Sequence, residues 1–97
     1  LNKKLSAQNV LLSFRSELIS LSAHQNNSLS YSNSLANPNL LIEINTNNLV
    51  ISEEVDSEIL IVNISNFGLN FTTNYSFYPV IGGVFTSTNG QISFVSN

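Results

Sequence analysis

The chain has 97 residues, a length that supports one domain around a single core and excludes two. Hydrophobic residues make up 42% of it and charged residues 9%, against roughly 25% charged in a typical soluble domain, so the surface is polar but mostly uncharged. A formal net charge of -3, with Lys3, Lys4 and Arg15 as the fixed cations, offers no basic surface to a phosphate backbone, and we predict no nucleic-acid partner.

The first predicted element is one long amphipathic helix over about residues 2–25. Its apolar side chains step by four, three, four and three, which is the spacing of one helix face. These side chains are Ala7, Leu11, Phe14, Leu18 and Leu21. Leu5, Leu12 and Ile19 are expected to widen that apolar face. The helix should end near Asn26, where polar residues begin to compete for backbone hydrogen bonds.

Residues 26–39 are predicted to form a polar connection, with a turn at Asn37-Pro38-Asn39. An antiparallel sheet of about five to six short strands is expected over residues 40–96, where short β-rich runs alternate with turn residues. These runs are 40–44, 49–52, 58–64, 69–72, 76–80, 84–87 and 91–95. Because the run 58–64 is the most apolar, we expect it to be a central strand.

Turns connect these runs. Residues 45–48 read as a hairpin turn, and the acidic residues 53–57 read as a second turn. Asn89-Gly90 between apolar runs predicts a hairpin, because both residue types tolerate the positive φ of a type I′ turn. Ile92 and Phe94 should then share one face of the last strand.

One helix on one face of an antiparallel sheet is an α+β fold, and residues 1–97 are expected to form this single domain. Six side chains of the last three runs are predicted to define the fold by burial. They are Phe77, Tyr78, Val84, Phe85, Ile92 and Phe94.

Enzyme chemistry needs convergent acids, bases or nucleophiles, and the chain has one His, no Cys, one Asp and five Glu. His24 lies at the expected helix end, where its side chain can meet the terminal carbonyl groups; a catalytic or ligand role is the alternative. We therefore predict that the protein is not an enzyme and has no catalytic residues and no cofactor.

Acidic residues gather between the second and third β-rich runs, at Glu53, Glu54, Asp56 and Glu58. Carboxylates from a flexible loop can hold calcium, but the spacing does not fit an EF-hand loop. A solvated turn that prevents wrong pairing of an edge strand is the competing interpretation. We favour the solvated turn and predict no metal site.

Four asparagines open an Asn-x-Ser/Thr sequence, which is a glycan acceptor in eukaryotic secretory proteins. They are Asn26, Asn63, Asn70 and Asn74. Chance produces such sequences in a chain this rich in Asn and Ser. Asn63 also falls in the run expected to be central, where a glycan would disrupt packing, so we discount the set.

The sequence has no run of about 20 apolar residues, so the chain is either soluble as it stands or separated from such a segment. Lys3 and Lys4 precede the apolar helix face and could meet anionic lipid headgroups if a membrane segment lies upstream. Lysines at a helix start oppose the helix dipole, which favours a helix that continues upstream.

Two stretches resemble a known family. Leu12-Ser13-Phe14-Arg15-Ser16-Glu17-Leu18 is similar to a helix pattern of Leu followed by Ala-Arg-Ser-Glu-Ala, with Leu18 in place of the second Ala. Phe77-Tyr78-Pro79-x-x-Gly82-Gly83, followed by Asn89-Gly90-Gln91-Ile92-Ser93-Phe94, resembles a closing hairpin of Phe-x-Pro-x-Gly and Gly-x-Ile-x-Phe. With the helix-then-sheet layout, these patterns resemble the soluble part of type IV pilins and type II secretion pseudopilins, closest to the minor pseudopilin GspH/FimT kind.

The resemblance implies a minor pilin or pseudopilin subunit of a type IV pilus, competence or type II secretion fibre. Such a subunit would act in assembly or priming through contacts with other pilin or pseudopilin subunits. It would be extracytoplasmic, in the periplasm or at the cell surface, and anchored in the inner membrane before assembly by an upstream helix absent from these 97 residues. DNA binding, which some relatives achieve through basic loops, is not carried over because the three cations here lie in the helix.

A second interpretation stays open. The chain could be a stand-alone extracellular structural or adhesin-like β-rich module, such as an adhesin, phage or capsid component, whose Asn- and Ser-rich loops face a ligand or a neighbouring subunit. A hydrophobic segment upstream of the chain would distinguish the two interpretations, because the pilin-like one requires it.

Overall fold

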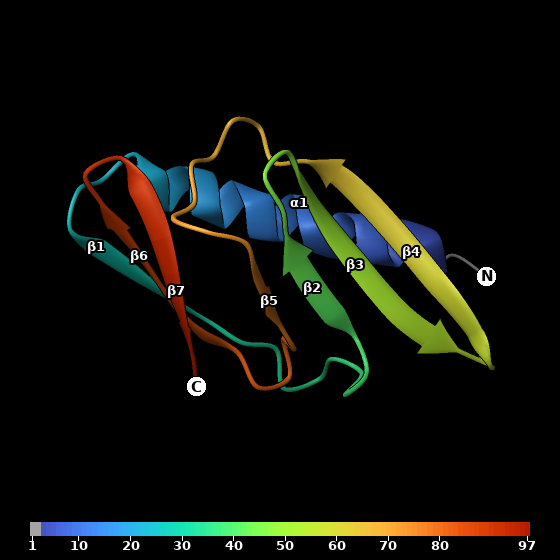
Figure 1. Cartoon of the computed structure of the whole chain (residues 1–97). Helices are drawn as coiled ribbons and strands as arrows, with labels where there is room; N and C mark the ends of the chain where they lie inside the picture. The colour runs from blue at the N-terminus through green and yellow to red at the C-terminus, as the bar shows by residue number, and fades with distance from the viewer. Residues whose placement is uncertain (1–2) are drawn as a thin grey trace.

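The computed structural model describes residues 3–97 and shows an α+β fold, in which one helix packs against two antiparallel sheets (Figure 1). The elements are α1 (Lys3–Ser22), β1 (Asn27–Tyr31), β2 (Leu41–Ile44), β3 (Asn48–Val55), β4 (Glu58–Ser65), β5 (Tyr75–Phe77), β6 (Gly83–Thr88) and β7 (Gln91–Ser96). The strand order is β1-β6-β7 in one sheet and β4-β3-β2-β5 in the other. The expected single sheet is thus divided in two.

Helix α1 buries the predicted apolar face, from Ala7 to Leu21. The predicted start at residue 2 lies outside the described residues. The helix ends at Ser22, three residues before the predicted end, because Ala23 and His24 close tighter turns onto Ser20 and Leu21. Asn26 then takes a positive φ of 57° and redirects the chain into β1.

Strand β1 lies inside the predicted polar connection 26–39, so that prediction is wrong for its first part. Its partner is β6, with Leu29 opposite Phe85. Leu29 and Tyr31 alternate with exposed serines and pack against the core. Two apolar side chains are enough to anchor β1, because it is an edge strand whose hydrogen bonds come from β6, a strand distant in the sequence.

The acidic turn predicted at 53–57 is also wrong in extent. Strand β3 continues through Glu53 and Glu54 to Val55, and the turn consists of Asp56 and Ser57 alone. Both turn residues have a positive φ, 52° and 68°, as a two-residue type I′ hairpin requires. Cross-strand pairing with β4 extends the strand beyond its apolar part.

Strand β4 is at the edge of the four-stranded sheet, not at its centre as predicted (Figure 1). Leu60, Val62 and Ile64 alternate inward, toward α1, while Ile59 and Ile61 are exposed on the other face. The long apolar run indicates a strand with apolar residues on both faces, which is not the same as a strand with two neighbours.

The three-stranded sheet contains the predicted Asn89-Gly90 hairpin, with φ values of 52° and 78°. The predicted strand 69–72 is reduced to one parallel bridge between Phe71 and Ile92. Hydrogen bonds of 3.0 and 2.8 Å from Thr72 N–H to the Ile92 carbonyl and from Ile92 N–H to the Asn70 carbonyl hold this bridge. The segment between β4 and β5 thereby links the two sheets.

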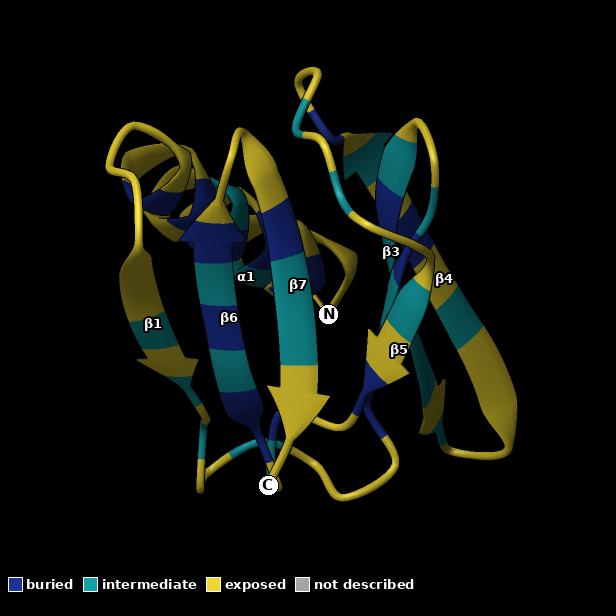
Figure 2. Ribbon diagram, turned by 60° about the vertical axis from the view of Figure 1, so that its left-hand side comes forward, coloured by how far each residue is buried: buried dark blue, intermediate teal, exposed yellow. Residues whose placement is uncertain are grey.

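The core lies between α1 and the two sheets, and β6 alternates between buried and half-buried residues along its length (Figure 2). Among the predicted fold-defining residues, Phe77, Phe85 and Ile92 are buried, and Val84 and Phe94 are half-buried. Tyr78 is the exception, because it is 44% exposed. The end of β5 at Phe77 leaves Tyr78 in the loop that leads to Pro79, outside the alternation of the strand.

Candidate interaction surface

Helix α1 carries a second apolar surface that the core does not use. Leu5, Leu12 and Ile19 are 52%, 38% and 38% exposed, so they do not widen the buried face as predicted. They are seven residues apart, and this spacing aligns them along one side of the helix. We call these three residues the helix stripe.

Arg15 shows on which side of the molecule the helix stripe lies. Leu12 and Ile19 are the i−3 and i+4 neighbours of Arg15 and therefore share its side of α1. Arg15 Nη1 donates a 2.9 Å hydrogen bond to the carbonyl of Ser65 at the end of β4, and its guanidinium lies 4.8 Å from the centre of the Phe67 ring. The helix stripe is thus on the β4 side.

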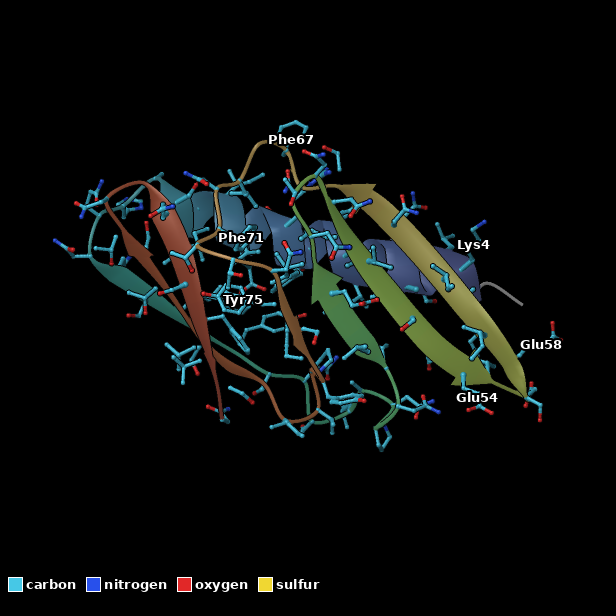
Figure 3. The ribbon with its side chains drawn as sticks, in the orientation of Figure 1. Lys4, Glu54, Glu58, Phe67, Phe71 and Tyr75 are labelled. Atoms are coloured by element: carbon cyan, nitrogen blue, oxygen red, sulfur yellow. The ribbon has the colours of Figure 1, made fainter. Side chains whose placement is uncertain are left out.

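Strand β4 adds apolar side chains on the opposite face of the sheet. Ile59 and Ile61 are 66% and 57% exposed and lie opposite Glu54 and Ser52 of β3. Figure 3 shows Lys4 beside β4, the acidic residues at the β3–β4 turn, and Phe67 beyond the other end of the strand. The free edge of β4 thus has exposed apolar side chains on the face that points away from α1, and half-buried ones, Leu60 and Ile64, on the α1 face.

The four acidic residues singled out in the sequence are spread along the β3–β4 hairpin. Glu53 and Glu54 are consecutive strand residues and point to opposite faces. Asn37 Nδ2 donates to a carboxylate oxygen of Glu53 at 3.0 Å, and Asn39 Nδ2 donates to the backbone carbonyl of Glu54 at 3.3 Å. Within residues 3–97, no three His, Cys, Asp or Glu side chains are close enough to share a metal ion.

His24 is exposed just after α1, and its Nδ1 lies 3.1 Å from the Ser20 carbonyl. This contact is the helix-end interaction that the sequence predicts. His24 and Glu17 line a shallow groove between α1 and β1. Near this groove, burial raises the pKa of the Tyr31 hydroxyl, and the Glu17 carboxylate raises it further by disfavouring a second negative charge.

The four Asn-x-Ser/Thr asparagines are all exposed, including Asn63 on the edge strand β4. The reason for discounting Asn63, its expected place in a central strand, is therefore wrong. The high frequency of Asn and Ser in the chain remains a reason to discount all four sequences as glycan acceptors.

No family model, no curated protein and no solved structure matches this chain significantly. Across the part of the chain that the structure describes, no helix is long and apolar enough to span a membrane.

Proposed function

We propose that the chain is the soluble part of a non-enzymatic minor pilin or pseudopilin, which acts in the assembly or priming of a type IV pilus, competence or type II secretion fibre. Its partners are other pilin or pseudopilin subunits. It works outside the cytoplasm, in the periplasm or at the cell surface, after anchoring in the inner membrane through an upstream helix.

The helix stripe is the observation that carries this proposal. A helix that only covered its own sheets would need one apolar face, and α1 has that face between Ala7 and Leu21. The exposed Leu5, Leu12 and Ile19 form a second face at heptad spacing, which is the pattern of a helix that packs against other helices.

The closing hairpin gives further support. In the stretch that resembles the family's ending, Phe77 ends β5, Gly82-Gly83 lead from the loop into β6, and Asn89-Gly90 form the β6–β7 turn. The other resembling stretch, from Leu12 to Leu18, lies entirely within α1. The helix pattern thus lies in a helix and the Asn89-Gly90 part of the ending lies in a hairpin turn, which supports the proposal.

The test is the N-terminus of the native protein in its source cells, determined by intact mass and terminal peptide sequencing. We expect an apolar segment of about 20 residues or more before Leu1, long enough to span a membrane, with a methylated aromatic residue at its start. A native chain that begins near Leu1, or after a conventional cleaved signal peptide, would refute the proposal.

One observation favours the alternative of a stand-alone extracellular adhesin-like module. Leu35, Tyr78 and Ile81 are exposed apolar residues in the loops after β1 and β5. A 2.8 Å hydrogen bond from Asn33 N–H to the Pro79 carbonyl holds these two loops together. If the N-terminal measurement refutes the pilin-like proposal, this loop surface becomes the first candidate for ligand contact.

A further inference from the structure

The outer edge of β4 offers backbone groups to another strand. In an antiparallel ladder, only alternate residues direct their N–H and C=O groups toward a given neighbour. Val55 and Glu58 flank the two-residue turn and form a pair that is hydrogen-bonded within the hairpin. Ile59, Ile61 and Asn63 therefore direct their backbone groups outward.

Arg15 supports this assignment independently. Ser65 belongs to the same alternate set as Ile59, Ile61 and Asn63, and its carbonyl accepts the hydrogen bond from Arg15. Besides the β3–β4 ladder, this is the one hydrogen bond to the backbone of β4 among the described residues. The edge is therefore occupied at its Ser65 end and open along Ile59–Asn63, where a further strand can pair.

A strand added at this edge would meet apolar side chains of β4 on both faces of the sheet. The half-buried Leu60 and Ile64 lie on the α1 face, and the exposed Ile59 and Ile61 lie on the opposite face. Burial on both faces gives a paired strand more stabilisation than backbone hydrogen bonds alone. The edge thus has the features of a site for strand addition.

Charge is distributed unequally along the strand. Asp56 and Glu58 lie at its start, whereas Arg15 lies at its end, bound to Ser65. Lys4 of α1 also lies beside the strand (Figure 3). Parallel addition of an identical strand would bring the acidic ends of both strands together. Antiparallel addition would bring the acidic end of each strand close to Arg15 of the other chain, and the opposite charges would attract each other.

We propose that this edge binds a second copy of the chain, with the two β4 strands antiparallel about a two-fold axis at Ile61. Ile59 of each copy then lies opposite Asn63 of the other, and Ser65 stays free to keep its bond with Arg15. The two α1 helices lie on the same face of the joined sheet. Such a two-fold contact closes on itself and makes a pair rather than a fibre.

This proposal does not rest on the pilin-like function. It follows from the open edge of β4 and from the charges of Asp56, Glu58 and Arg15, so a stand-alone module with the same strand and helix would pair in the same way. The N-terminal measurement does not affect it.

Sedimentation equilibrium of the 97-residue chain tests the pair directly. We expect a concentration-dependent mass that rises toward twice the chain mass of 10.6 kDa. Ile61→Lys would place two like charges at the axis and raise the dissociation constant by about tenfold or more. The matched control is Val95→Lys, a similar change at an exposed position of the edge strand β7, which should pair like the unchanged chain.

Charge reversal tests the antiparallel orientation. Arg15→Glu and Glu58→Lys should each weaken the pair, and the double variant should recover most of the lost affinity, because the two charges then attract again across the axis. Circular dichroism and thermal unfolding show whether each variant still folds. A control with Glu17→Lys, away from the β4 edge, should leave the dissociation constant unchanged.

Three outcomes would overturn the proposal. One is a chain that stays monomeric up to about 1 mM, the weakest affinity that we would count as specific pairing. Another is a pair that Val95→Lys breaks as effectively as Ile61→Lys. The third is open-ended growth beyond two copies, which would show that the contact is not two-fold.

Discussion

Gly82 has a φ of 76°, and a side chain at this position would have no space. A Cβ there would collide with the Tyr31 carbonyl oxygen and with Ser32, because the end of β1 crosses close to the loop before β6. Gly90 has a nearly identical φ of 78°, but nothing lies within 4 Å of the position that its Cβ would take. Substitutions at the two glycines can therefore distinguish the cost of backbone strain from the cost of a steric clash.

We expect Gly90→Ala to lower the free energy of unfolding by about 1–2 kcal/mol, the cost of a left-handed alanine. Gly82→Ala should lower the free energy of unfolding by about 1–3 kcal/mol more than Gly90→Ala, because it also forces β1 and the loop apart. Urea denaturation of both variants measures the difference. Equal losses would show that Tyr31 does not approach Gly82 as closely as described.

At the scale of elements, Asn66 connects the end of β4 to the β2–β3 turn. It is buried, and its Nδ2 donates to the carbonyls of Thr46 at 2.8 Å and Asn45 at 3.3 Å. Its Oδ1 accepts a 3.0 Å hydrogen bond from Gly68 N–H. One polar side chain thus fixes a turn and the chain's exit from β4.

Asn66→Ala would remove three part-buried hydrogen bonds of a buried side chain, and we expect it to lower the free energy of unfolding by about 1–3 kcal/mol. Asn70→Ala is the matched control, because the Asn70 side chain is exposed, and its effect should stay within about 0.5 kcal/mol. Chemical denaturation distinguishes the two. A loss as small as that of the control would mean that water replaces the side chain of Asn66 at no cost.

At the scale of the whole molecule, one bridge ties the β4–β5 segment to β7, and the two sheets are joined mainly through their packing. The Phe14 ring on α1 lies 4.8 Å from Tyr31 of β1, 5.4 Å from Phe85 of β6 and 5.7 Å from Phe77 of β5, measured between centroids. The first two strands belong to one sheet and β5 to the other. Phe14 thus contacts both sheets.

We expect Phe14→Ala to cost about 3–5 kcal/mol, the range for a fully buried phenylalanine. Phe67→Ala, which removes an exposed ring stacked on Arg15, should cost less than about 1 kcal/mol. Thermal unfolding followed by circular dichroism and by tyrosine fluorescence measures both. A loss for Phe14→Ala as small as that for Phe67→Ala would show that Phe14 is not the shared support of the two sheets.

The sequence by itself determined what depends on local pattern. The four-three repeat from Ala7 to Leu21 predicted the buried face of α1, because helical periodicity fixes which side chains share a face. Turn chemistry predicted the hairpins at 45–48 and 89–90, since these residue types accept the backbone conformation of a tight turn. The fold class followed from these elements.

Only the tertiary structure decided what depends on distant partners. Strand β1 exists because β6 pairs with it, β3 extends past its apolar part because β4 pairs with it, and β4 lies at an edge because no further strand of the described chain joins it. Alternation along a strand shows which residues share a face, but strand order decides which edge stays open. The candidate surface, with the helix stripe beside the free edge of β4, depends on that order, and no local pattern contains it.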